Sequence, residues 1–157
     1  MISKTLRFID RFFPPRKVYA HCDIPCGIYD PHNAQVAAHT VIRMVSLLEE
    51  ANNDFHAVAR LTRVKEDHAE LVKHEVRIIW GDYFKPEHLE KYPELHNLVF
   101  EIMKLGSKAK QDTDAKVAED LLSKVQDFAE IFWKSKDLEP KRVKAPYPSG
   151  GEIVLHS

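Results

Sequence analysis

The pattern of apolar and polar positions along the chain predicts a helical protein. Apolar residues recur at intervals of three and four over residues 34–51, which is the period of one face of an α-helix. The same period runs through residues 55–81 and 94–108, and again after the Asp-Thr-Asp segment at 112–114. Because the connections between these stretches are short, the chain is predicted to be all-α, an antiparallel four-helix bundle over residues 32–136.

Capping residues and helix breakers mark where the predicted helices begin and end. Asp30-Pro31 is typical of an N-cap followed by the first helical residue, and residues 112–114 are predicted to cap the fourth helix. Gly106, followed by a serine, is predicted to loosen the end of the third helix. Residues 82–93 contain two prolines and are predicted to form a structured connection with one short helical turn.

The first predicted helix is apolar on a second face as well. Val36, Ile42 and Leu47 lie outside the stripe that faces the core. We therefore predict two partners for this helix, the bundle core and another subunit, although a helix buried at the centre of the bundle explains the same pattern.

The composition changes after residue 136. Prolines and glycines between Pro140 and Gly151 exclude a helix there. Ile153-Val154-Leu155 is apolar enough to add a short strand or to pack on a neighbour. Residues 137–157 are nevertheless predicted to be a flexible tail, the usual state of a chain end that nothing ties down.

Charge and hydropathy exclude two classes of partner. The 157 residues carry a net charge of −1, and residues 1–20 carry five basic residues against Asp10. The net charge is therefore +4 for residues 1–20 and −5 for the remainder. That balance disfavours nucleic acid, since a nucleic-acid binder usually presents a basic face. No apolar run approaches the length of a membrane span, so no membrane partner is expected.

Candidate chemistry concentrates in one short segment near the N-terminus. The chain has two cysteines, Cys22 and Cys26, and His21 stands directly before the first. Two thiols and an imidazole within six residues form a metal-ligand cluster, and Pro25 and Gly27 let the segment curl into a hook. No second ligand pair completes a zinc-finger spacing. A disulfide across three residues adds little stability, so reduced thiols and a cytoplasmic location are predicted.

A planar metal site becomes available if the chain begins at His21. The amine of His21, the backbone nitrogen and sulfur of Cys22, and the sulfur of Cys26 then form a square, with the His21 imidazole within reach of an axial position. Tetragonal sites of this kind suit Cu(II) or Ni(II). This geometry requires cleavage between Ala20 and His21. We therefore expect residues 1–20, which lack the apolar region of an export signal, to be a pro-segment; a basic amphipathic helix that stays attached is the alternative.

Several sequence blocks carry a family resemblance. The hook reads His21-Cys22-Asp23-Ile24-Pro25-Cys26-Gly27-Ile28-Tyr29-Asp30-Pro31, and the blocks Glu70–His74, Trp80–Pro86, Glu90–His96 and Ile131–Trp133 follow it. Together they resemble the nickel-containing superoxide dismutase family, over about residues 21–136. The resemblance implies a homohexamer of four-helix bundles that binds one nickel ion per subunit. It also implies disproportionation of superoxide by Ni(II)/Ni(III) cycling, and a separate maturation protease that cuts between Ala20 and His21.

The resemblance also implies a role for individual residues. His21, Cys22 and Cys26 correspond to the nickel ligands of the family. Tyr29 is expected to stand over the open face of the metal, where its phenol can hold water or small anions. Asp23 is expected to help fix the hook, which here spans residues 21–31. Lys85 matches a family position near the hook, and its positive charge is expected to attract the anionic substrate.

The sequence departs from the family at the expected partners of the His21 imidazole. Family members hold that ring with a glutamate on the first helix and an arginine on the second. The matching positions here are Ala37 and His68. We therefore predict that His68 or an ordered water takes over this role.

Two other classes of function use the same hook residues. The hook is also compatible with a nickel- or zinc-carrying module without turnover, and with a helical interaction protein that has a redox-switchable dithiol. Other sites have no support: no histidine follows a glutamate by three residues, as a di-metal bundle site needs, and no phosphate-binding glycine motif is present.

Overall fold

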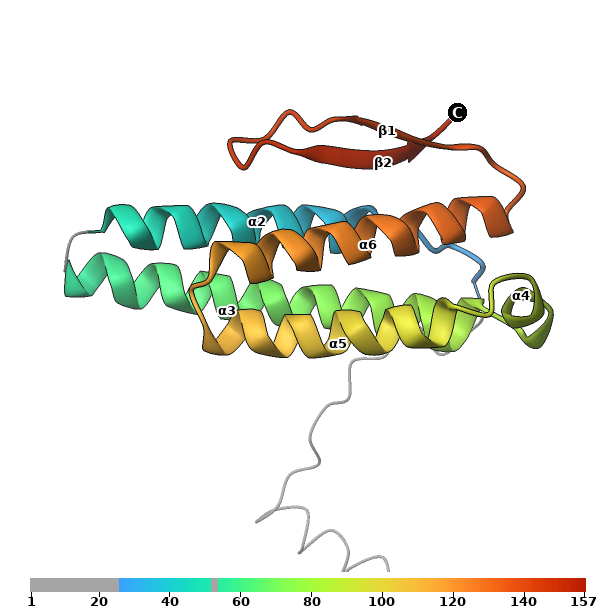
Figure 1. Ribbon diagram of the computed structural model, residues 1–157, viewed down its shortest axis with the longest axis horizontal. Coiled ribbons are helices and arrows are strands. Elements are labelled where there is room, and N and C mark those ends of the chain that lie inside the picture. The colour runs from blue at the N-terminus through green and yellow to red at the C-terminus, as the bar shows by residue number, and fades with distance from the viewer. Residues whose placement is uncertain (1–25, 52–53) are drawn as a thin grey trace, which may run out of the picture.

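The structure is a computed structural model that describes residues 26–51 and 54–157. Within these residues the chain is mostly helical, which confirms the fold class at that level. The long helices of this part of the chain lie side by side (Figure 1); they are α2 His32–Glu50, α3 Phe55–Ile78, α5 Leu95–Gln111 and α6 Ala115–Ser135. Helix α2 contacts α3 and α6, and α5 contacts the same two helices.

Shorter elements fill the connections and the C-terminal region. A π-helical turn, η1 Ile79–Tyr83, continues α3, and a short helix, α4 Pro86–Lys91, follows it. This confirms the predicted connection with one short helical turn. Strands β1 Pro140–Lys144 and β2 Glu152–His156 pair antiparallel after α6.

Aspartate side chains accept hydrogen bonds from backbone nitrogens at helix starts, as the sequence predicts for Asp30 and Asp114. The Asp114 carboxylate accepts a hydrogen bond from the backbone nitrogen of Lys116 at 2.8 Å, which caps α6. The Asp30 carboxylate accepts from the backbone nitrogen of His32 at 2.7 Å. The regular helix α2 begins at His32, one residue later than the sequence pattern suggests.

The core lies between the four long helices. Helix α2 contributes mostly small side chains to it, and small side chains let helix backbones approach closely. Helices α5 and α6 contribute the large ones. The most deeply buried large apolar residues include Phe128, Phe132, Leu95, Ile102 and Leu121. This core fixes the end of the molecule where α2 begins, α4 lies and α6 ends (Figure 1).

Gly106 does not loosen the third long helix. Helix α5 runs through this residue to Gln111, so that prediction is wrong. The physical reason is a close approach of another helix: a Cβ atom at Gly106 would lie 2.8 Å from the Cγ atom of Lys73 on α3. The glycine is therefore explained by packing across helices and not by the end of a helix.

The C-terminal region is a hairpin and not a flexible tail. Its strands pair from Pro140 opposite His156 to Lys144 opposite Glu152, which corrects the prediction for residues 137–157. The hairpin lies over α2 and α6, on the side away from α3 and α5 (Figure 1). Two features hold it there: Ile153 and Val154 are buried, and polar side chains of both helices bond to its backbone. The short strand that residues 153–155 permitted therefore forms.

Helix α2 also contacts the hairpin of the same chain, while the predicted contact of its second apolar face with another subunit stays a prediction. Gln35 and His39 of α2 form hydrogen bonds to the hairpin. The described helices include none that is long and apolar enough to cross a membrane.

Candidate metal centre

Cys26 is the one predicted metal ligand within the described residues. Its side chain is exposed, and Gly27 after it has a φ angle of +71°, a left-handed conformation that glycine adopts readily. The resulting turn directs the backbone nitrogen of Ile28 at the Cys26 sulfur, 3.5 Å away. An N–H group aimed at sulfur stabilises negative charge there, and thiolate is the form in which cysteine binds metals. Cys26 is thus accessible and held in a local geometry that suits a soft metal ion.

His21, Cys22 and Asp23 lie outside the described residues, so their predicted roles stay predictions. Among the residues that the structure does describe, no group of three or more His, Cys, Asp or Glu side chains could hold a metal ion. The donor set of the hook nevertheless fits nickel, because thiolate sulfur and nitrogen ligands together suit a tetragonal nickel site.

Tyr29 links the hook to the helices. Its side chain is half-buried, and its ring packs against that of Tyr83 with the centroids 5.7 Å apart. Tyr29 is followed by Asp30, whose carboxylate accepts from the backbone nitrogen of His32, so the aromatic contact and this hydrogen bond fix the base of the hook between them. The predicted role of Tyr29 over the metal stays a prediction, but the structure shows what supports its ring.

Tyr29 packs on a cluster of aromatic rings, which we call the aromatic platform. It consists of Tyr83, Phe84, His88, Phe128 and Phe132. Tyr83 is at its centre: its ring lies 4.9 Å from that of Phe132, 5.1 Å from that of Phe84, and stacks on His88 at 5.5 Å. Such ring pairs add stability beyond the area that they bury. The platform joins the π-helical turn, α4 and α6 at one end of the molecule.

Tyr83 is a functional candidate that the sequence reasoning did not single out. It ends the π-helical turn η1, in which the backbone nitrogen of Phe84 donates to the carbonyl of Ile79, five residues back. Its hydroxyl hydrogen-bonds with Ser135 Oγ on α6 at 2.9 Å. Turns of this type occur often at functional sites. Tyr83 lay within a family-like block, but no periodicity in the sequence marks a π-helical turn.

Two lysines lie at the platform. Lys136 Nζ lies over the rings of Tyr83 and Phe132, 5.1 and 5.2 Å from their centroids. Lys85 is exposed just before α4, and its backbone nitrogen donates to His88 Nδ1 at 3.0 Å. Both lysines therefore add positive charge at the end of the molecule where the hook joins α2.

Ala37 and His68, which stand where the family has the partners of the imidazole, differ in their surroundings. Ala37 is buried in the core and has no polar side chain to offer. His68 lies on α3, and its Nδ1 bonds to the carbonyl oxygen of Val64 at 2.8 Å. Because a carbonyl only accepts, Nδ1 carries the proton, and a neutral ring keeps Nε2 as an acceptor.

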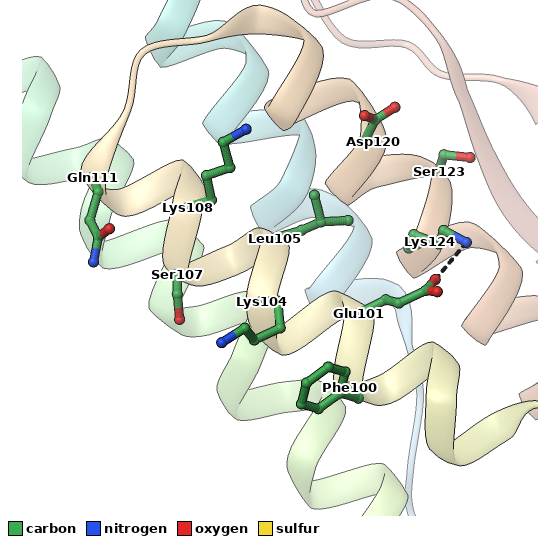
Figure 2. Close-up of a pocket in the computed structure, with 10 residues that line it drawn as sticks. All are labelled: Phe100, Glu101, Lys104, Leu105, Ser107, Lys108, Gln111, Asp120, Ser123 and Lys124. Atoms are coloured by element: carbon green, nitrogen blue, oxygen red, sulfur yellow. Dashed lines mark ion pairs between the residues drawn. The ribbon is translucent and has the colours of Figure 1, made fainter.

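A groove of about 820 Å³ between α5 and α6 is not this site (Figure 2). Most of its lining comes from the C-terminal half of α5 and the N-terminal half of α6, away from the end where Cys26 precedes α2. Lys124 and Glu101 form an ion pair across it at 2.7 Å. Its lining contains no thiol and no imidazole.

Comparisons with known proteins identify the family. A family model described as nickel-containing superoxide dismutase matches residues 16–136. A superoxide dismutase [Ni] from Streptomyces seoulensis is 45% identical over 129 residues, which are 82% of this chain and 98% of that protein. The chain belongs to the nickel-containing superoxide dismutase family.

Further relatives agree with this family assignment. A superoxide dismutase [Ni] from Streptomyces coelicolor is 44% identical over 129 residues. A solved native structure of a nickel superoxide dismutase superimposes with a TM-score of 0.70 at 44% identity, over 74% of this chain and 99% of that one. The nickel superoxide dismutase family model ends at residue 136, so the C-terminal hairpin lies outside the region that it matches.

Proposed function

We propose that this chain disproportionates superoxide to dioxygen and hydrogen peroxide, with one nickel ion per subunit held by His21, Cys22 and Cys26. The observation that carries the proposal is the family match over residues 16–136, which includes the whole hook. One superoxide gives up an electron and leaves as dioxygen; a second takes up that electron and two protons and leaves as hydrogen peroxide. Bound nickel supplies the one-electron redox centre, between Ni(II) and Ni(III).

The ligand set requires a free amine at His21, so we infer cleavage between Ala20 and His21 by a separate protease. Residues 1–20 are then a pro-segment. The new terminus supplies the amine and imidazole of His21, the backbone nitrogen and thiolate of Cys22, and the thiolate of Cys26. A backbone nitrogen and two thiolates are strongly donating ligands, which favour the higher oxidation state of the metal.

The remaining hook residues control access and orientation. Tyr29 would lie beside the bound metal, where its phenol would hold water or a small anion and limit what reaches the site. The contact of its ring with Tyr83 restricts the positions that it can adopt. Asp23 helps fix the hook, and Lys85 raises the local concentration of the anionic substrate. These are roles in positioning and in attracting charge, and they complement the ligands.

The proposed mature protein is a homohexamer in the cytoplasm, and each subunit carries its hook on an antiparallel four-helix bundle. The contacts of α2 and α5 with both α3 and α6 support the bundle. Light scattering on the processed protein tests the assembly, since a mass of one or two chains is incompatible with a hexamer.

One preparation tests the proposed function directly. The protein is purified from cells that contain nickel and the maturation protease, and its N-terminal sequence, metal content and superoxide removal are measured together. We expect a chain that begins at His21, one nickel per chain, and loss of both nickel and activity in Cys26→Ser. The matched control Ser123→Ala, on α6, should keep both.

Two results would contradict the proposal: an active protein that still begins at Met1, or undiminished activity after both cysteines are replaced by serine. A metal-carrying module or a redox switch would bind metal or cycle its thiols without turnover. The comparisons do not favour that alternative, because the relatives that match at nearly full length are named as dismutases.

We further propose that His68 replaces the missing partner of the His21 imidazole. The support is chemical: with Nδ1 donating to Val64, Nε2 is left to accept a hydrogen bond. In His68→Ala, the Ni(III) spectrum and turnover should both change, whereas His56→Ala near the start of α3 should leave both unaltered. An unchanged spectrum and rate in His68→Ala would assign the role to water.

A further inference from the structure

Three buried polar side chains converge on the C-terminal hairpin. Among the described residues, Gln35, His39 and Gln126 are the buried polar side chains without a formal charge. Gln35 Nε2 donates to the Val154 carbonyl at 3.0 Å, and its Oε1 accepts from the Val154 nitrogen at 2.7 Å. His39 Nε2 lies 3.0 Å from the Glu152 carbonyl, to which Gln126 Nε2 also donates.

These bonds make the hairpin an integral part of the fold. The Gln35 side chain is fully buried, and its amide pairs with Val154 as the backbone of another strand would. A buried amide that loses its partners pays the full cost of desolvation. The sequence of α2 therefore suits a chain in which the hairpin stays docked.

The hairpin is anchored to α6 as well as to α2. Arg142 of β1 donates to Glu130 and, at 2.8 Å, to Asp127, both on α6. It also donates to Gln126 at 3.1 Å. Because Gln35 ties β2 to α2 and Arg142 ties β1 to α6, the hairpin bridges the two helices on their outer side (Figure 1).

The two bridged helices are the ones that position the hook against the aromatic platform. Gln35 lies in the first turn of α2, and its backbone nitrogen donates to the carbonyl of Pro31, at the base of the hook. Phe132 and Ser135 of α6 hold Tyr83, on which Tyr29 packs. A shift of α2 relative to α6 would therefore move the base of the hook relative to its support.

We propose that the hairpin positions the hook and that Gln35 is its main positioning residue. By clamping the first two turns of α2 to α6, it fixes the base of the hook over the platform. The inference rests on the proposed function, and it concerns residues 137–157, which the family model does not match. The hairpin, which lies outside the family match, would thus hold the base of the hook in this chain.

The first test uses amide hydrogen exchange on the full-length, metal-free chain. Gln35→Leu removes the α2 anchor, and Arg142→Met removes the α6 anchor from an exposed position. We expect amides in the first two turns of α2 to exchange about tenfold faster in both variants, because local opening becomes easier when anchoring hydrogen bonds are lost. Ile102→Val, a core variant on α5, is the control for general loss of stability.

The second test uses the processed, nickel-loaded protein. We expect both hairpin variants to alter the Ni(III) electron paramagnetic resonance spectrum and to lower turnover per bound nickel by about tenfold, since small displacements of reacting groups are costly. Ile102→Val should lower only the melting temperature. A hairpin that merely covers the helices would give parental spectra and parental α2 exchange in both anchor variants, and this would overturn the proposal.

The two proposals fail in different ways. If the parent chain binds no nickel or does not remove superoxide, the proposed function fails, while the exchange experiment still tests the clamp. If the parent chain is active and both anchor variants behave like Ile102→Val in both experiments, only the clamp fails. Arg142 is exposed, so Arg142→Met remains informative if Gln35→Leu does not fold.

Discussion

Lys65 is a buried lysine whose ammonium group donates hydrogen bonds to backbone carbonyls at the C-terminal end of a neighbouring helix. It lies on α3, is 1% exposed, and its ammonium donates to the carbonyls of Ala109, Lys110 and Asp112 at the end of α5. The last carbonyls of a helix have no partners within it and carry partial negative charge. Burial lowers the pKa of Lys65, although the nearby carboxylates of Glu66 and Asp112 oppose this. One side chain thus joins two helices through backbone groups.

We expect Lys65→Met to destabilise the protein, because it keeps the buried hydrocarbon but leaves these carbonyls without a donor. The free energy of unfolding in a urea titration should fall by roughly 1–3 kcal/mol, the usual cost of buried groups that lose their partners. Lys108→Met, an exposed lysine on α5, should change it by less than about 0.5 kcal/mol. Equal midpoints for parent and Lys65→Met would show that water replaces the ammonium.

At the scale of elements, the contacts that dock the hairpin include a titratable histidine, His39. His39 Nε2 donates to the Glu152 carbonyl, so Nδ1 of the neutral ring accepts from the Ser149 hydroxyl at 2.9 Å. Burial lowers the pKa of His39 from its ordinary value of 6.5, and the bond to the Glu152 backbone only partly offsets this. Tyr147 and Arg43 line the same crevice.

The sign of the pH effect follows from this lowered pKa. The unfolded chain binds a proton at His39 more readily than the folded one, so the contribution of His39 to stability is complete above pH 6.5 and is lost as the pH falls below it. We expect the melting temperature to fall as the pH drops below about 6.5, and His39→Gln to flatten that dependence. Parallel curves for parent and His39→Gln would mean that another histidine is responsible.

How far local sequence predicts these elements depends on where the partners lie. The helices were predictable because period and capping act within a few residues, as Asp114 and Lys116 illustrate. Gly106 was misjudged because its reason is Lys73, on another helix. The hairpin was missed because its anchors, such as Gln35 to Val154, join residues 119 positions apart. No local pattern shows that the side chain of a glutamine in the first turn of a helix hydrogen-bonds to a strand far along the chain.

In the candidate site, too, features set by neighbouring residues could be predicted, whereas features set by residues distant in the sequence could not. Cys26 and Tyr29 could be proposed as site residues because the hook is a compact motif in one segment of the sequence. The contribution of Tyr83 depends on a π-helical turn and on Ser135 and Phe132 of α6, which only the fold brings together. The sequence thus predicts a ligand set, which stays a prediction, whereas the residues that support the hook can be seen only in the fold.

At the scale of the whole molecule, the proposed substrate and the protein carry charge of the same sign. Residues 21–157 have a net charge of −5, and superoxide is an anion. Local positive charge near the hook must therefore outweigh the overall repulsion if association is to be fast. Lys85 and Lys136 lie at the platform, and we propose that they supply that charge.

We expect Lys85→Glu to slow superoxide removal at low ionic strength by about tenfold or less, and the difference from the parent to shrink as salt rises, because salt screens exposed charges. Lys108→Glu is the matched control: it changes the net charge equally but lies near the far end of α5, beside the groove (Figure 2). Pulse radiolysis over a range of salt concentrations measures both. Equal losses in the two variants would attribute the effect to net charge alone.

The way in which helix side chains cover one border of the hairpin has a consequence for solubility. Side chains of α2 and α6 occupy outward-facing backbone groups of β2, so a foreign strand cannot pair along that border. Within the hairpin this leaves β1 as the open border, and it starts with Pro140 and carries Lys141 and Lys144, both exposed. Proline and lysine on an outer strand discourage sheet extension from molecule to molecule. The hairpin is thereby protected against seeding fibrils or precipitates at high concentration.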